Sequence, residues 1–146
     1  MTSKRPVSIL VVIHTPAQHV LLLERATHPG YWQSVTGSQE DDEALIETAR
    51  REVAEETGLR ADTNALVDWR LSNRFEIFAE WRHRYANGIT HNTEHVFSLC
   101  VPDNAAIVIA RDEHVAYRWL PARQAAAACF SWSNRDAILM LAAGGA

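Results

Sequence analysis

The segment 37–59 constrains this chain most, because a helical pattern within it carries a cluster of carboxylates. Residues 42–57 include no glycine or proline, and most of them favour helix. We therefore predict a helix over these residues, with Asp41 or Asp42 as its N-cap. Gly58 is expected to end the helix in a left-handed conformation, which glycine adopts easily.

Two faces of this predicted helix overlap. Glu52, Glu55 and Glu56 share one face at i, i+3, i+4 spacing, and Glu56 projects into the edge of the apolar face. An unpaired carboxylate there would take up a proton or cost several kcal/mol. A divalent cation would remove that problem, since Mg²⁺ prefers oxygen ligands. The alternative is a solvated acidic face paired with Arg50 and Arg51. The apolar face comprises Leu45, Ile46, Ala49 and Val53.

The segment has the order Gly, five residues, Glu, seven residues, then Arg-Glu-apolar-x-Glu-Glu-x-Gly-apolar. It matches the Nudix box at every defined position, so the chain resembles the Nudix hydrolases. The resemblance implies cleavage of a diphosphate linkage with Mg²⁺, for which Mn²⁺ can substitute. It also implies an α/β (α+β) fold, the Nudix-type α/β/α sandwich with a mixed β-sheet.

The resemblance also implies roles for the box residues. Glu52 and Glu56 are expected to bind the metal, and Glu55, Glu56 and Arg51 are counted as the catalytic residues. Glu55 is expected to be a further ligand or the group that orients water. Arg51 is expected to form an internal ion pair with Glu43, which fixes the helix against the preceding loop.

A further carboxylate, Glu113, lies outside the box. Residues 113–120 have the sequence Glu-His-Val-Ala-Tyr-Arg-Trp-Leu, and in similar family members the glutamate of this pattern is a metal ligand. A loop position would let its side chain reach the predicted helix. The resemblance therefore implies that Glu113 is the third metal ligand, with Glu55 or Glu113 as the proton acceptor. An exposed loop charge is the alternative.

Segments outside the box resemble a bacterial branch of the family that acts on dihydroneopterin triphosphate in folate biosynthesis. The expected reaction yields dihydroneopterin monophosphate and pyrophosphate. The alternative is a housecleaning pyrophosphohydrolase for dATP or an oxidised nucleotide, since pterin and purine rings are alike in shape. A binding module without turnover is disfavoured, because every box carboxylate is present. The resembling segments are 4–13, 32–38, 75–78, 82–86, 92–94 and 131–135.

Substrate contacts are expected from these segments and from one further cation. Lys4 and Arg25 suit triphosphate oxygens, or they are plain surface charges. Thr36 offers a hydroxyl beside the metal centre. The residues 75–78 would flank a pterin ring, or pack as an ordinary strand. Ser131 either contacts the ligand or caps the last helix. The full candidate set is Lys4, Arg25, Thr36, Phe75, Glu76, Ile77, Phe78 and Ser131.

Composition narrows the class of protein. A length of 146 residues predicts one domain, residues 1–146. The net charge of −4 argues against a general nucleic-acid binder. Cys100 and Cys129 have no metal-type spacing, which indicates a reducing compartment, and no run is long enough to cross a membrane. We expect a cytoplasmic enzyme that binds a small triphosphate, without nucleic-acid or membrane partners, and leave its oligomeric state open.

Patterns along the rest of the chain predict strands interleaved with helices. The Asn87–Gly88 pair predicts a hairpin turn. Pro121 is expected at the first position of a helix that ends near Cys129. A final helix is expected over 133–143. The predicted strands are 7–13, 20–23, 31–36, 66–71, 75–81, 95–101, 107–110 and 115–120.

Overall fold

The computed structural model describes residues 3–144, which form a mixed sheet between two helical layers. The strand order is β3-β2-β1-β6-β5, with β4 paired to β1 and β7 to β2. Only β1 and β6 run parallel among the paired strands of this region. The strands are β1 (Val7–His14), β2 (His19–Arg25), β3 (Trp32–Gln33), β4 (Val35–Ser38), β5 (Leu66–Glu76), β6 (His91–Cys100) and β7 (His114–Pro121).

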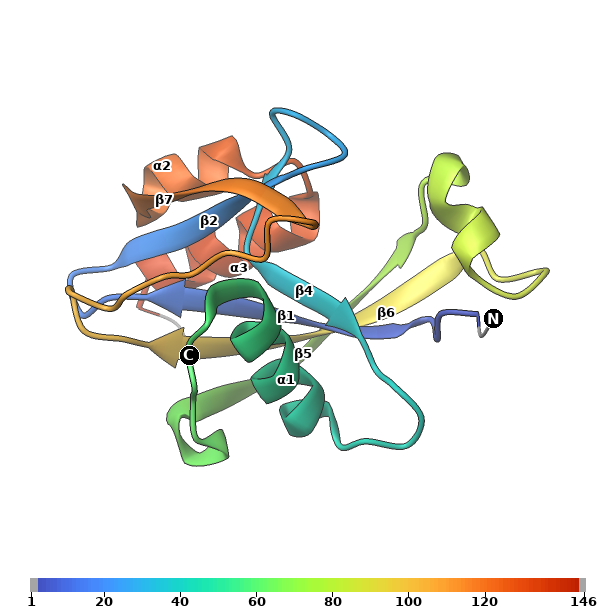
Figure 1. Cartoon of the computed structure of the whole chain (residues 1–146), viewed down its shortest axis with the longest axis horizontal. Helices are drawn as coiled ribbons and strands as arrows, with labels where there is room; N and C mark the ends of the chain where they lie inside the picture. The colour runs from blue at the N-terminus through green and yellow to red at the C-terminus, as the bar shows by residue number, and fades with distance from the viewer. Residues whose placement is uncertain (1–2, 145–146) are drawn as a thin grey trace.

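Helix α1 (Leu45–Thr57) covers one face of the sheet (Figure 1). Helices α2 (Ala122–Ala128) and α3 (Trp132–Ala142) cover the other face. This confirms the predicted α/β/α sandwich. Two short 3-10 helices, η1 (Thr63–Ala65) and η2 (Ala79–Arg84), lie in connections. None of the helices in the described part of the chain has the length and apolar character needed to cross a membrane.

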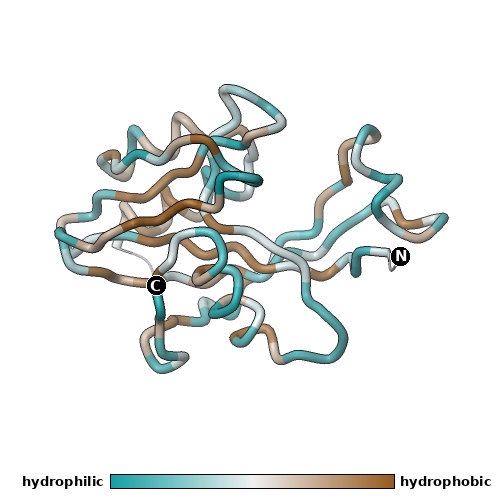
Figure 2. Tube along the Cα trace, viewed as in Figure 1, coloured by the Kyte–Doolittle hydropathy of each residue, from teal (hydrophilic) through white to brown (hydrophobic). Residues whose placement is uncertain are grey.

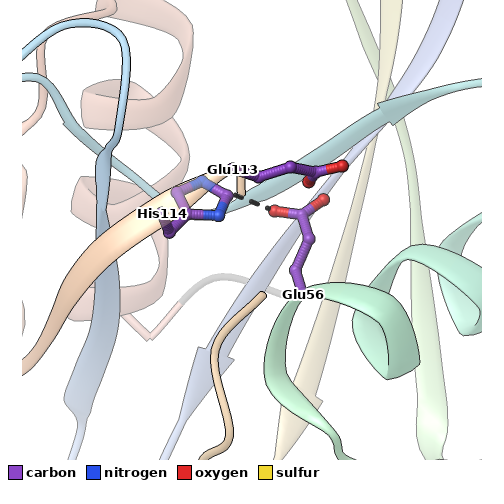
Figure 3. Close-up of side chains that lie close together, drawn as sticks. All are labelled: Glu56, Glu113 and His114. Carbon is purple, nitrogen blue, oxygen red and sulfur yellow. Dashed lines mark ion pairs between the residues drawn. The ribbon is translucent and has the colours of Figure 1, made fainter. Parts of the chain in front are cut away.

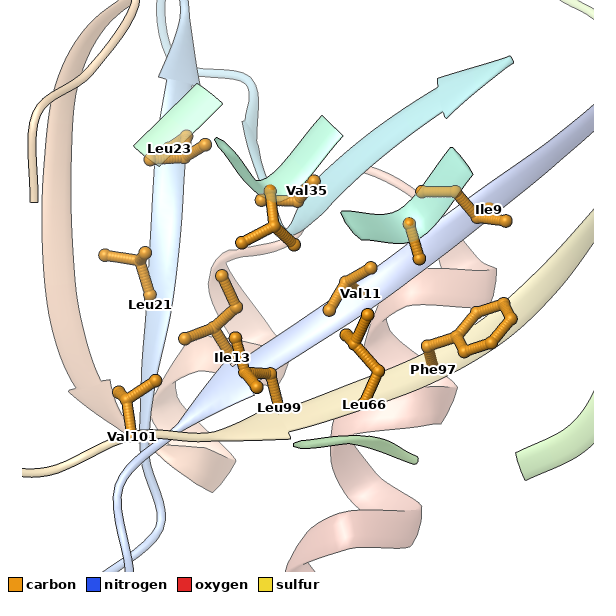
Figure 4. Close-up of a cluster of buried hydrophobic side chains, with 12 residues drawn as sticks. Ile9, Val11, Ile13, Leu21, Leu23, Val35, Leu66, Phe97, Leu99 and Val101 are labelled. Atoms are coloured by element: carbon orange, nitrogen blue, oxygen red, sulfur yellow. The ribbon is translucent and has the colours of Figure 1, made fainter. Parts of the chain in front are cut away.

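Strand β1 is buried on both faces, which explains its unbroken apolar sequence. Its residues alternate between two cores, because neighbouring side chains of a strand point to opposite faces. Ile9 and Val11 belong to the core beneath α1 (Figure 4), and Leu10 and Val12 to the core beneath α2 and α3. The hydrophobic parts of the trace accordingly lie in the central strands, and the loop between β4 and α1 is hydrophilic (Figure 2).

The arrangement of β4 positions the start of the box. Strand β1 pairs with β2 only between His14 and Val20, at its far end. Its first half pairs instead with β4, where Ile9 is opposite Gly37. The chain therefore leaves the centre of the sheet at Gly37 and enters the loop that leads to α1. This topology places the glycine directly beneath the helix.

Helix α1 ends where the sequence predicts but begins three residues later than residue 42. Gly58 is left-handed, with φ 75°, and Glu56 is buried on the apolar side as expected. The helix begins at Leu45 with no side-chain cap, so Asp41 and Asp42 are not N-caps. Asp41 has a positive φ of 48°, which is not helical, and belongs to the preceding turn.

The strand predicted over 107–110 is wrong. These residues have no strand partner in the described chain, and the alternation comes from packing over α1. Ile107 and Ile109 pack on the α1-side core, and Val108 is exposed. The amide of Val108 donates to the carbonyl of Thr57 instead of to a strand.

The predicted strands over 66–71 and 75–81 are also corrected. They form the single strand β5, whose register shifts between Asp68 and Ser72. Beyond Glu76 the pairing with β6 ends, and η2 replaces the expected strand. Gly88 forms a turn with φ 89°, but inside a long connection rather than a tight hairpin. Pro121 ends β7 and caps α2 instead of being its first residue.

Candidate active site

A cleft of about 1000 Å³ opens beside the end of β4 and the last turns of α1. Its lining is strongly charged and includes both carboxylates and cations. It combines residues from the N-terminal segment, β2, β4, α1 and the loop before β7. Six predicted site residues line it, namely Lys4, Arg25, Thr36, Glu52, Glu56 and Glu113.

Gly37 is required by the close approach of Glu52. A methyl group at position 37 would overlap the Glu52 carboxylate, which lies directly against the glycine. The side chain of Glu52 is 13% exposed, and its carboxylate lies at the edge of the cleft. The glycine therefore lets β4 and α1 pack closely enough to place this carboxylate in the cleft.

Glu56 is the most buried carboxylate of the cleft, at 1% exposure. Its Oε1 atom has no hydrogen-bond partner among residues 3–144. Figure 3 shows its side chain extending from the end of α1 toward Glu113 and His114, at the start of β7. One oxygen or nitrogen from each of these three side chains lies within 4.8 Å of the others.

The electrostatics of this cluster fit a bound cation. Burial, and then the neighbouring carboxylates of Glu52 and Glu113, hold the pKa of Glu56 well above its usual range. Burial also raises the pKa of Glu52 to about 7, partly opposed by Arg51. A buried, unpartnered carboxylate among like charges is costly in a folded protein. The oxygen-rich donor set suits a divalent cation such as Mg²⁺, and a neutral imidazole is a further ligand type.

His114 joins this cluster, although the sequence patterns did not place it in the site. Its Nε2 atom lies 3.8 Å from Oε1 of Glu56, and the ring is almost fully buried. Burial, and then Arg25, lower the pKa of His114 to about 4, so the ring is neutral. The only available signal was its position directly after Glu113.

Arg51 holds the loop before α1 in place, as the resemblance implied. Its Nη2 atom donates to Oε1 of Glu43 at 2.7 Å and to the carbonyl of Ser38 at 3.1 Å. The hydrogen bonds from Arg51 lower the pKa of Glu43 to about 2. Arg51 does not line the cleft, so it acts by positioning β4 and the loop around the carboxylates.

We expect Arg51→Lys to lower the free energy of unfolding by about 2 kcal/mol, because a lysine cannot reproduce the forked hydrogen bonds. Arg50→Lys is the matched control, since Arg50 is exposed and pairs with Glu47. Urea unfolding at pH 7 measures both. The pKa of Glu43 falls from 4.5 to about 2 on folding, so this contribution is present above pH 4.5. The stability that the Arg51–Glu43 pair contributes should be lost as the pH falls toward 2. Equal free energies of unfolding for the two variants at pH 7 would contradict the positioning role of Arg51.

Cations also line the cleft, and Lys4 and Arg25 lie close enough to the carboxylates of α1 to interact with them. Lys4, Arg25 and Arg84 all border it, and the amide of Lys4 donates to the carbonyl of Arg84. Burial, and then Arg84, lower the pKa of Lys4 to about 8, which indicates a desolvated cation. Arg25 donates to Gln33, whose amide in turn donates to Thr36 at 3.4 Å. These groups form a surface suited to phosphate oxygens.

Aromatic rings also line the cleft. Trp81, from η2, lines it together with His28, and the two ring centroids are 5.3 Å apart. The guanidinium of Arg25 lies 4.8 Å from the Trp81 ring. The aromatic cluster comprises His28, Tyr31, Phe78, Trp81 and Phe130.

Other predicted site residues lie outside the lining of the cleft. Glu55 is exposed and lies 3.6 Å from Arg51. Glu76 is exposed and pairs with Arg82, whereas Ile77 is buried. Phe75 is half-buried on β5, and Phe78 contacts the ring of Trp81. Ser131 caps α3 by accepting from the amide of Asn134, which supports the capping alternative.

Sequence patterns missed Gln33, Trp81, Arg84 and His114. Gln33 and Arg84 lie within two of the segments that carry the resemblance, 32–38 and 82–86. Trp81 carries no local signal, because only the fold brings η2 to the cleft. The site is therefore more aromatic and more basic than the box alone predicts.

Comparisons with known proteins agree with this geometry. The NUDIX domain model matches residues 4–141. A dihydroneopterin triphosphate diphosphatase of Escherichia coli (strain K12) is 50% identical over 138 residues, which cover 92% of this chain and 91% of that protein. A Haemophilus influenzae protein of the same name is 42% identical over 141 residues, 94% of this chain and 88% of the other. The solved structure of the E. coli dihydroneopterin triphosphate pyrophosphohydrolase superposes with a TM-score of 0.91 at 46% identity and covers 99% of this chain and 100% of that one.

Proposed function

Because the chain belongs to the NUDIX family, we propose that it is a Mg²⁺-dependent pyrophosphohydrolase of folate biosynthesis. It cleaves dihydroneopterin triphosphate to dihydroneopterin monophosphate and pyrophosphate. The observation that carries the proposal is the cleft, which is lined by a carboxylate cluster, by cations and by aromatic rings. Those are the three surfaces that a metal-bound triphosphate with a planar heterocycle requires. The identity to two diphosphatases of this name over most of the chain supports the same substrate.

The carboxylates would hold the metal. Glu52 and Glu56 present oxygens from one face of α1, and Glu113 approaches from the loop opposite. A bound divalent cation would lower the pKa of water and neutralise charge on the phosphate oxygens. The backbone fixes Glu113 in this position, because its carbonyl accepts from the amide of Ala26 at 2.9 Å.

The cations bind the triphosphate and stabilise the leaving pyrophosphate. Lys4 and Arg25 are partly desolvated, so their charges act more strongly than on an open surface. Arg84 adds a further cation to the lining of the cleft. Positioning and charge stabilisation of this kind supply most of the catalysis in phosphoryl transfer.

Glu113 is the group that would accept a proton from the attacking water. It is exposed within the cluster, whereas the side chain of Glu52 is only 13% exposed and Glu56 is buried. A solvent-connected carboxylate can pass the proton on to bulk water, and proton transfer to a positioned side chain contributes to the rate. Glu55 lies outside the cleft beside Arg51, which makes it the weaker candidate for this role.

The aromatic rings would receive the heterocycle. Trp81 borders the cleft next to Arg25, so a ring stacked there keeps its phosphates near Lys4 and Arg25. Flat heterocycles bind well on aromatic rings. The arrangement therefore orders the substrate from ring to phosphates along the cleft.

The test is product formation from dihydroneopterin triphosphate. We expect one pyrophosphate for each dihydroneopterin monophosphate with Mg²⁺, and no product after EDTA. Chromatography of the pterin and a coupled pyrophosphate assay measure the two products. Release of inorganic phosphate alone, or turnover that survives EDTA, would contradict the proposal.

A further inference from the structure

A second buried carboxylate lies away from the metal-binding cluster. Glu94, on β6, is 6% exposed, and its Oε1 has no hydrogen-bond partner in the described chain. Burial raises the pKa of Glu94 to about 7, opposed only by the nearby hydroxyl of Ser133 on α3. Buried polar groups are normally satisfied, so this one requires an explanation. No role in the metal chemistry accounts for it.

The strand register places Glu94 in one row with Ser38, which lines the cleft, although Glu94 itself is not among the lining residues. Glu94 is opposite Ser8 of β1, and Ser8 is opposite Ser38 of β4. Residues directly opposite each other share one face of a sheet. Ser38 lines the cleft, so this polar row runs from the cleft across about two strand spacings, ~10 Å. It lies on the face that α2 and α3 cover, because Leu10 and Val96 of the same strands belong to that core.

A second unsatisfied atom lies beside Glu94. The amide nitrogen of Asn92 donates to the hydroxyl of Ser8 at 2.7 Å, and its Oδ1 atom is buried without a partner among residues 3–144. Asn92 also lies on the same face as Glu94, two residues along β6. Two buried acceptors, Oε1 of Glu94 and Oδ1 of Asn92, therefore have no donor from the protein.

We propose that Glu94 and Asn92 recognise the hydrogen-bond donor edge of the substrate's heterocycle. The inference rests on the proposed function and names the feature of the substrate that this enzyme selects. A pterin presents a ring N–H and an exocyclic amino group side by side. Guanine presents the same pair, whereas adenine presents a ring acceptor beside its amino group. A carboxylate accepts from two adjacent donors and therefore favours the first two rings.

One neighbouring ring fits this placement. Phe75 of β5 is opposite Asn92, so it lies on the same face and borders the polar row. Asn134, next to Ser133 on α3, holds β4 against this face by accepting from the amide of Ser34 at 2.7 Å. The polar row thus lies between the aromatic residue Phe75 and the first turn of α3, with the cleft at its end.

The test compares dihydroneopterin triphosphate, dGTP and dATP in Glu94→Gln. We expect kcat/KM to fall about 100-fold for the first two, because the glutamine amide presents a donor to a donor, and to change less than about threefold for dATP. Glu47→Gln, an exposed change on α1, is the control and should alter no ratio. Equal losses of kcat/KM for all three substrates would mean a structural role for Glu94 and would overturn the proposal. Unchanged kcat/KM values for all three substrates would overturn it as well.

Two further measurements keep the outcome decisive. If kcat/KM of the wild-type enzyme is no higher for dihydroneopterin triphosphate than for the nucleotides, the proposed function fails. A preference for dGTP over dATP that Glu94→Gln removes would still support the recognition site. If Glu94→Gln does not fold, the wild-type protein is tested with phosphate-free dihydroneopterin, guanosine and adenosine by calorimetry. We expect the first two to bind at least about tenfold more tightly than adenosine. Equal affinities would overturn the inference.

Discussion

Glu56→Gln is expected to lower kcat by about three orders of magnitude while leaving the fold intact. The substitution removes a charged oxygen from the centre of the carboxylate cluster, where metal binding supplies several kcal/mol of charge stabilisation. Glutamine has nearly the same volume, so the core around α1 should not change. Steady-state rates at saturating Mg²⁺ measure the loss, with Glu47→Gln as the exposed control. Turnover within about tenfold of wild type would contradict the role of Glu56.

The same variant should be more stable than wild type when metal is absent. The pKa of Glu56 is raised in the folded protein, so folding favours the protonated carboxyl. That contribution is complete below the unfolded pKa of 4.5 and is lost as the pH rises through the higher folded value. Thermal unfolding in EDTA should therefore show a higher Tm for Glu56→Gln at pH 8 and little difference at pH 4. Lower stability of the variant at pH 8 would contradict the electrostatic account.

Gly37→Ala should lower kcat/KM at least about 100-fold with little loss of stability. The new methyl group would overlap the carboxylate of Glu52, a flexible side chain that can move aside. Moving it displaces a metal ligand from the cleft, and a misplacement of about 1 Å can cost 100-fold in rate. The midpoint of activation by Mg²⁺ should rise in the same variant.

Gly88→Ala provides the opposite control. Gly88 has a φ of 89° and open space around it, so an alanine there is strained without touching any site residue. A left-handed alanine costs about 1–2 kcal/mol, and Gly88→Ala should therefore lower Tm but preserve kcat/KM. Normal activity of Gly37→Ala would show that close packing of β4 on α1 does not position Glu52.

The sequence predicted the parts of the site that depend on local periodicity. The overlap of the acidic and apolar faces of α1 indicated a buried Glu56, and the structure confirms it at 1% exposure. Gly58 ends the helix in a left-handed conformation, which depends on the glycine itself and not on distant contacts. The two helical layers and the mixed sheet also agree with the predicted sandwich.

The missed features depend on contacts between distant segments. His114 meets Glu56, and Trp81 meets His28, only after the sheet and its connections assemble. Glu94 joins the polar row through strand register, which no single segment specifies. The error at 107–110 has a related cause, since alternating residues that pack on a helix resemble a strand locally.

The most direct measurement is a competition assay in which dihydroneopterin triphosphate, dATP and dGTP share one reaction with wild-type enzyme and Mg²⁺. Relative consumption gives the ratios of kcat/KM, and the phosphorus products show which bond is cleaved. We expect a preference of at least about tenfold for the pterin, with pyrophosphate released. Equal consumption of the three substrates, or a preference for a nucleotide, would contradict the assignment to folate biosynthesis.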